Sequence, residues 1–206
     1  DVRIQADRVA STLGSTVVDR FPWSGSTQPA ITSSSQLVIA NTWGSSMAVV
    51  GLAGAPDPSN AGNTLRPSTA AKLVFRLPPS LDADEAANRV KSTLEKDPPQ
   101  GATVSFDLES PQTGWHAKSL SPKLLASLDH SSKTFFGAPM MTMGTGGTIP
   151  FMKMLGDRFP ACQFFVTGVL GPHSNAHGPN EFLHLDTGKR VTCCVAEVLA
   201  DRASQT

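Results

Sequence analysis

The sequence predicts a mixed α/β fold built in two parts. In the first part, several apolar runs of strand character surround an amphipathic helix that begins near Asp82. In the second part, helices alternate with two short strand-like runs, a pattern typical of a parallel sheet. With 206 residues, the chain is long enough to bury a sizeable core. We therefore expect an α+β domain over residues 1–112 and part of an α/β domain over residues 113–206.

The first part is predicted to hold a helix over residues 2–13, a polar connector through Ser35, and then a sheet. Four strands are expected, at residues 36–42, 46–52, 70–77 and 102–108. Trp43, Gly44 and Ser45 lie between the first two and suit a hairpin turn. These strands favour an antiparallel sheet with helices on one face.

The most clearly marked helix of the first part starts at Asp82. Glu85 follows three residues later, which makes a capping box, and apolar residues then recur at helical spacing as far as Leu94. Pro98 and Pro99 end the pattern.

The second part has three predicted helices. Ser121 can cap one that runs to about Phe136, another covers 151–158, and the last covers 186–203 with Asp186 as its cap. Short strands are expected at 140–144 and 163–170. Two strands do not make a stable open sheet, so this half is expected to be a piece of something larger.

The composition of the chain limits the kinds of partner that it can bind. Lysine plus arginine and aspartate plus glutamate each number 17, so the formal net charge is zero, which argues against nucleic acid or an anionic membrane as partner. No apolar run approaches the roughly 20 residues of a membrane span. The three cysteines, Cys162, Cys193 and Cys194, lack metal-ligand spacing and are expected to be buried fillers. Their odd number favours a reducing compartment, so a cytoplasmic location is expected.

Residues 171–184 carry three histidines in a loop pinned by glycine and proline, directly after the 163–170 run. His177 stands between two small residues, which would allow a ligand to approach closely, although a structural role remains open. His173 lies four residues before it, but that spacing binds one metal well only on a helix. His184 and Asp186 have the spacing of some dinuclear metal sites, and a capping role for Asp186 is the favoured alternative.

A second loop, residues 144–149, is rich in glycine and precedes a helix. Such a turn can present backbone N–H groups to an anion. It lacks the Lys-Ser/Thr pair of a phosphate-binding Walker loop, so a plain turn is an equal alternative.

Four segments together resemble a family of zinc metallopeptidases that includes carboxypeptidase G, carnosine dipeptidase, aminoacylase and succinyl-diaminopimelate desuccinylase. Their order and spacing match from about residue 36 onward, and the second and fourth are the more specific. The segments are Gly62-Asn63-Thr64-Leu65-Arg66-Pro67 with the run ending Phe75-Arg76-Leu77-Pro78-Pro79, then Gly146-Gly147-Thr148-Ile149-Pro150, Val166-Thr167-Gly168, and Asn175-Ala176-His177-Gly178-Pro179-Asn180-Glu181.

The resemblance implies that residues up to about 112 form a lid or dimerisation domain, and that the rest closes the catalytic domain. It also implies a homodimer formed through the lid and a peptide or N-acyl amino-acid substrate with a free carboxylate. Two zinc ions would be bound, with His177 as one ligand. The implied substrate contacts are Arg76, Asn63 (or Thr64), Gly147, Thr148 and Asn175.

The resemblance also has gaps. Gly144 and Thr145 stand where many members carry Arg-Glu. The family's catalytic glutamate and other metal ligands belong to an N-terminal half that has no counterpart here. No catalytic residue is therefore expected in this chain, and the isolated chain is expected to be inactive unless it meets that N-terminal half. A non-catalytic dimerisation or interaction module with the same fold is the alternative. A third possibility is a mononuclear site from His173, His177 and His184.

Overall fold

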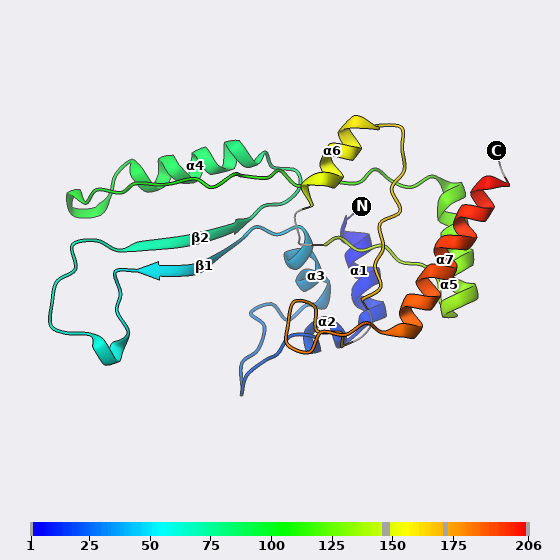
Figure 1. Ribbon diagram of the computed structural model, residues 1–206, viewed down its shortest axis with the longest axis horizontal. Helices are drawn as coiled ribbons and strands as arrows, with labels where there is room; N and C mark the ends of the chain where they lie inside the picture. The colour runs from blue at the N-terminus through cyan, green and yellow to red at the C-terminus, as the bar shows by residue number, and fades with distance from the viewer. Residues whose placement is uncertain (1, 146–148, 171–172, 205–206) are drawn as a thin grey trace. The chain divides into compact units, whose positions relative to one another are not determined.

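The structure is a computed structural model that describes residues 2–145, 149–170 and 173–204 (Figure 1). It confirms the mixed fold class, with α-helices and a small two-stranded antiparallel sheet. Contacts divide the chain into two compact units. The first unit comprises residues 1–35, 117–143 and 156–206, and the second unit comprises residues 36–116 and 144–155. The assignment of 1–112 to a lid and 113–206 to a catalytic domain stays a prediction.

Two helices form the centre of the first unit. Helix α5 (Pro122–Phe136) and helix α7 (Leu185–Ala203) lie side by side (Figure 1). They are antiparallel, because Arg190 near the start of α7 lies over the ring of Phe136 at the end of α5. Leu128 and Val198 are buried, with 3% and 8% of their surface exposed. Burial of apolar side chains like these is what stabilises two amphipathic helices against each other.

The predicted start of α5 is confirmed. Ser121 is the N-cap, with its Oγ accepting a hydrogen bond from the Leu124 N–H, and proline occupies the first helical position. At the other end, Gly137 adopts a left-handed conformation with φ +72°, which ends the helix.

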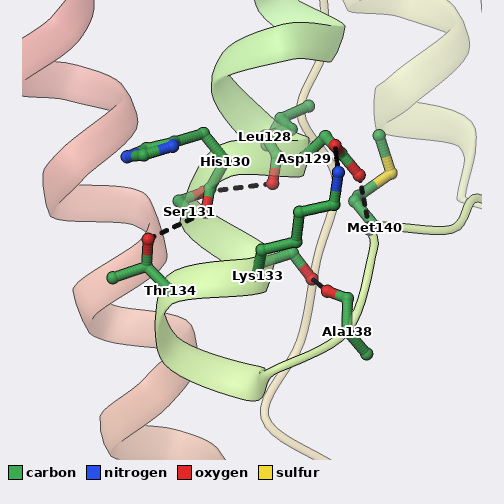
Figure 2. A network of polar contacts seen from close by, with 9 residues as sticks. Leu128, Asp129, His130, Ser131, Lys133, Thr134, Ala138 and Met140 are labelled. Atoms are coloured by element: carbon green, nitrogen blue, oxygen red, sulfur yellow. Dashed lines mark hydrogen bonds and ion pairs between the residues drawn. The ribbon is translucent and has the colours of Figure 1, made fainter.

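Polar contacts tie the chain after α5 back onto that helix (Figure 2). The Asp129 carboxylate accepts a hydrogen bond from the Met140 N–H (3.2 Å) and pairs with Lys133 one turn along (2.5 Å). Ser132 donates its hydroxyl to the Ala138 carbonyl. Lys133, followed by the Met140 N–H, holds the pKa of Asp129 below its ordinary value. The carboxylate is therefore charged when it fixes this segment.

The remaining helices of the first unit are shorter. Helix α1 (Val2–Leu13) is confirmed with the predicted bounds and buries Ala6, Val9 and Ala10. Helix α2 (Thr16–Asp19) lies inside the region predicted as a connector. Helix α6 (Pro150–Arg158) matches its prediction within one residue, and its residues fall in both units.

The strand predicted at residues 36–42 is wrong, because this segment belongs to helix α3 (Ser34–Thr42). Short apolar runs fit a buried helix as well as a strand, and periodicity does not separate them. Gly44 does not form the predicted hairpin turn. Its N–H donates to the Ile39 carbonyl, and a Cβ at this position would come within 2.6 Å of the Ala40 carbonyl oxygen. Gly44 therefore allows the chain to leave the helix.

Strands β1 (Ser46–Ala53) and β2 (Ala70–Arg76) are confirmed and pair antiparallel (Figure 1). Ser46 lies opposite Arg76, and the register shifts between Val49 and Gly51, so Val50 is an extra residue in β1. Apolar side chains of β1 are exposed on both sides of this shift, with Val49 59% and Leu52 60% exposed. These apolar side chains of β1 are therefore uncovered in the described part of the chain.

Helix α4 (Ala83–Glu95) begins as predicted, with the Asp82 carboxylate accepting from the Glu85 N–H at 2.9 Å. The Glu95 carboxylate accepts from the Phe106 N–H (2.7 Å), and Lys91 donates both to Glu95 and to the Phe106 carbonyl. Side chains of α4 therefore occupy the backbone groups of Phe106 that a strand partner would use.

Three further predicted strands are wrong, because no partner strand pairs with these segments in the described part of the chain. The described residues of 102–108, 140–144 and 163–170 form no strand, and no parallel sheet is present in the described part of the second half. A period-two pattern marks a segment that suits a sheet, but a strand exists only where another strand completes its hydrogen bonds.

Across the described ranges, no helix is long and apolar enough to cross a bilayer.

Candidate functional site

The histidine loop closes on itself through four hydrogen bonds. The Phe182 N–H donates to the Ser174 carbonyl (3.2 Å), and the Gly178 N–H donates to the Asn175 carbonyl (2.9 Å). The Asn175 side chain donates from Nδ2 to the Pro179 carbonyl (2.7 Å). The Glu181 carboxylate accepts from the His177 N–H (3.1 Å). Residues 174–182 are thus held as a compact loop, which we call the histidine loop.

The backbone of this region is unusual for its residue types. His173, Asn175, His177 and Asn180 all have positive φ, between 53° and 61°. Residues with a side chain adopt this left-handed conformation uncommonly, and each does so at a steric cost. Asparagine tolerates it better than most, which fits two of the four positions. The hydrogen bonds of the loop are what offset the cost at His177.

Gly178 is required here by close approach. A Cβ at this position would lie 2.5 to 2.7 Å from three atoms of the Asn175 side chain. The absence of a side chain at Gly178 therefore makes room for the Asn175 amide to reach Pro179. Next to it, Ser174 is buried (2% exposed), and its hydroxyl has no hydrogen-bond partner among the described residues.

His177 is exposed at this loop, as a residue that meets a ligand has to be. Two of its predicted companions, His184 and Asp186, lie at the start of α7 (Leu185–Ala203). His184 is the N-cap of α7: its Nδ1 accepts from the Thr187 N–H at 3.3 Å. The prediction that Asp186 caps this helix is wrong, because Asp186 lies inside its first turn. A histidine cap is rare, which is why the aspartate was favoured from sequence.

The described residues contain no group of three or more His, Cys, Asp or Glu side chains that could hold a metal ion. This argues against a mononuclear site from His173, His177 and His184. Zinc in proteins takes about four donors, so the donor set described here does not fit a complete zinc centre. His177 remains a single candidate ligand.

The expected substrate contacts fall in several places. Arg76 ends β2 and Asn63 lies in the exposed loop between β1 and β2, both in the second unit. Asn175 belongs to the histidine loop in the first unit. Gly147 and Thr148 lie outside the described residues. The roles of these residues and of His177 stay predictions.

The cysteines divide between surface and core. Cys194 is buried on α7, where its thiol donates to the Ser131 carbonyl of α5 at 3.6 Å, and burial raises its pKa. Cys162 and Cys193 are exposed, so the expectation that all three are buried is wrong for these two. Adjacent residues on a helix point about 100° apart, which places Cys193 and Cys194 in different surroundings.

Comparison with known proteins places this fold. A curated relative, the cysteinylglycine-S-conjugate dipeptidase of Corynebacterium striatum, is 28% identical over 155 residues, which are 73% of this chain and 33% of the relative. The chain thus spans about a third of that dipeptidase. A scan against models of protein families gives no match.

Solved structures of the same kind share the fold. The M20 family metallo-carboxypeptidase Sso-CP2 from Sulfolobus solfataricus has a TM-score of 0.64 at 22% identity, over 94% of this chain and 41% of that one. Human carnosine dipeptidase 1 has a TM-score of 0.62 at 16% identity, over 92% and 42%. The dipeptidase Dug1p from Saccharomyces cerevisiae has a TM-score of 0.66 at 16% identity, over 90% and 41%.

The fold of this chain is therefore that of the M20 metallopeptidases. The chain spans about two fifths of the length of each of these three solved structures. The resemblance to this family, drawn from the four sequence segments, is confirmed for the fold. Two features were not predicted: the contact from Glu181 to the His177 backbone in the histidine loop and the capping role of His184 at the start of α7. Glu181 lies within the fourth segment, so its position in the motif was visible although its contact was not.

Proposed function

We propose that this chain is the C-terminal part of a dinuclear zinc exopeptidase or amidohydrolase. The parent enzyme would cleave a peptide or N-acyl amino-acid bond next to a free carboxylate. The observation that carries the proposal is the histidine loop, which presents an exposed His177 on a fold shared with metallopeptidases. The curated relative, whose name describes a dipeptidase, supports the same reaction class.

In this proposal His177 supplies one zinc ligand, and the N-terminal half of the same enzyme would supply the remaining ligands and the general base. Zinc bound at such a site would polarise the amide carbonyl and activate water. Arg76 would grip the substrate carboxylate, since a guanidinium pairs with a carboxylate through two hydrogen bonds. Asn63, Gly147, Thr148 and Asn175 would complete the substrate contacts.

The isolated chain is accordingly expected to be inactive and to bind zinc weakly. Equilibrium dialysis of the purified 206-residue chain against zinc, with metal analysis, measures this directly. We expect less than one tightly held zinc per chain, and a His177→Asn variant should lower the weak binding further. A stoichiometric site with sub-micromolar affinity would contradict the proposal.

Adding an N-terminal half in trans provides the positive arm. Co-expression with the corresponding segment of the Corynebacterium striatum dipeptidase is expected to create zinc binding that depends on His177. The second candidate is a non-catalytic interaction module with the same fold. Binding of the N-terminal segment without any gain of zinc would support that candidate.

We further propose that the chain forms a homodimer through its lid and works in the cytoplasm. The apolar side chains of β1 carry the first part of this proposal, because residues such as Val49 and Leu52 are exposed on a strand that has a partner on only one edge in the described part of the chain. Two reduced, exposed cysteines are compatible with a reducing compartment.

A further inference from the structure

Glu181 and Asn175 determine the shape of the histidine loop more directly than any other side chains described there. Each makes a hydrogen bond that spans four residues, one to the backbone of His177 and the other to the backbone of Pro179. The Glu181 carboxylate receives the N–H of His177 itself. The Asn175 amide reaches past Gly178 to the Pro179 carbonyl. Glu181 thus holds the His177 N–H directly, and Asn175 closes the stretch of residues 175–179 that contains His177; we call these two contacts the clamps.

These clamps matter because the conformation of His177 is intrinsically unfavourable. With φ at +61°, the residue lies in the left-handed region, where its Cβ is too close to the following carbonyl oxygen. A hydrogen bond from an N–H to a carboxylate is charge-assisted and stronger than a neutral one. The contact between the His177 N–H and Glu181 is thus well suited to offset that cost.

We infer that Glu181 and Asn175 are positioning residues that fix the backbone of His177, and with it the direction in which the imidazole leaves the loop, before any ligand arrives. The Glu181 clamp contacts only the His177 N–H, and the Asn175 clamp acts through Pro179, so together they set the direction of the Cα–Cβ bond and leave both ring nitrogens available to a ligand. The loop is expected to have the same backbone with and without metal. The role of His177 as a zinc ligand rests on the proposed function, whereas the pre-formed loop does not.

The first test is backbone NMR of the full chain without metal. Amide hydrogen exchange at His177 is expected to be slow in the unmodified protein and about tenfold or more faster in Glu181→Ala, because the acceptor is lost. Glu181→Gln keeps an acceptor oxygen and is expected to restore most of the protection. Asp186→Asn is the matched control, since it neutralises an exposed acid five residues away. Equal exchange in the unmodified protein and Glu181→Ala would overturn the inference.

The second test separates positioning from general support of the loop. Zinc sulfate is titrated into the chain while the ring signals of His177 and the backbone amides of residues 174–182 are followed. In the unmodified protein, zinc should shift the ring signals and leave most of these amides in place. In Glu181→Ala and Asn175→Ala, the amides should move together with the ring. Reorganisation of the loop amides in the unmodified protein would contradict a pre-formed loop.

The two tests fail in different ways. If zinc does not perturb the His177 ring at all, the metal role in the proposed function fails, and the exchange experiment alone decides whether Glu181 positions His177. If zinc perturbs the ring but Glu181→Ala exchanges like the unmodified protein, the metal role stands and the positioning role is excluded. A His177→Asn variant identifies which ring signals belong to this residue.

Discussion

At the scale of single residues, glycine is required at different positions of this chain for different physical reasons. Gly137 supplies a left-handed backbone at the end of α5, whereas Gly44 and Gly178 are needed because other atoms lie too close for a side chain. The sequence alone identifies such glycines as turn residues without telling these cases apart. For that reason Gly44 was predicted as part of a hairpin and is in fact the exit from α3.

Replacement of Gly44 by alanine is expected to destabilise the second unit. The new methyl group would meet the Ala40 carbonyl at 2.6 Å, and relieving such a clash typically costs about 1–3 kcal/mol. Chemical denaturation followed by circular dichroism gives the free energy of unfolding. Gly188→Ala is the control: Gly188 lies within α7 with no atom closer than 3.9 Å, so this change should stabilise by about 0.5–1 kcal/mol. An undiminished stability in Gly44→Ala would show that α3 can shift to accept the methyl.

Whole elements were predictable where side chains mark their ends. The caps at Asp82 and Ser121 set the starts of α4 and α5, and both were confirmed to the residue. The segments at 102–108 and 163–170 show the limit of this approach. Their patterns suit strands, but strand formation depends on a partner that a local pattern does not specify. The conformation of the histidine loop was likewise not predictable from a local pattern. Its left-handed residues are histidines and asparagines, whereas glycine is the residue that usually marks this conformation.

Helices α5 and α7 should depend strongly on Leu128. This side chain is buried at 3% exposure, and Leu128→Ala is expected to cost about 2–5 kcal/mol because it leaves a cavity. Leu125 lies one turn earlier on the same helix and is 39% exposed. Leu125→Ala should therefore cost less than about 1 kcal/mol. Urea denaturation of both variants measures the difference, and similar losses would mean that the α5–α7 interface is not where the structure places it.

The end of α5 should be sensitive to acid through Asp129. Because Lys133 and the Met140 N–H lower the pKa of this carboxyl in the folded state, its contribution to stability is complete above the ordinary aspartate pKa of about 3.9 and is lost as pH falls through the lowered value. Asp129→Asn removes the charge. The melting temperatures of the two proteins should differ at pH 6 and converge near pH 2.

The exposed Asp107 offers a control for this pH dependence. Asp107→Asn should melt at the same temperature as the unmodified protein throughout the range. A gap between Asp129→Asn and the unmodified protein that persists at low pH would mean that Asp129 acts through packing and not through its charge.

At the scale of the whole molecule, the two units differ in how much they bury. Among the described residues, the first unit holds most of the buried apolar side chains, while the second unit has Val38 and Ala83. Those of the first unit are Ala6, Val9, Ala10, Val17, Leu128, Cys194 and Val198. The small core of the second unit leaves the apolar side chains of β1 in contact with water. Exposed apolar strands of this kind favour association with another polypeptide.

Self-association through β1 is therefore expected in solution. Light scattering after gel filtration should give the mass of a dimer for the unmodified chain and a lower mass for the double variant Val49→Lys, Leu52→Lys, because lysine on an edge strand opposes pairing. Leu65→Lys is the control, since Leu65 is 97% exposed in the loop that joins the two strands. A monomeric mass for the unmodified chain would remove the dimer from the proposal.

The shift in register at Val50 has a consequence for how such an assembly ends. A regular edge could accept one new strand after another and grow into a fibre. Here the extra residue bends β1 and interrupts the row of backbone donors and acceptors midway along its length. An incoming strand can match the edge on one side of Val50 and falls out of step on the other. The same strand that invites a partner thus limits open-ended growth, and should keep concentrated solutions of the protein clear of fibrils.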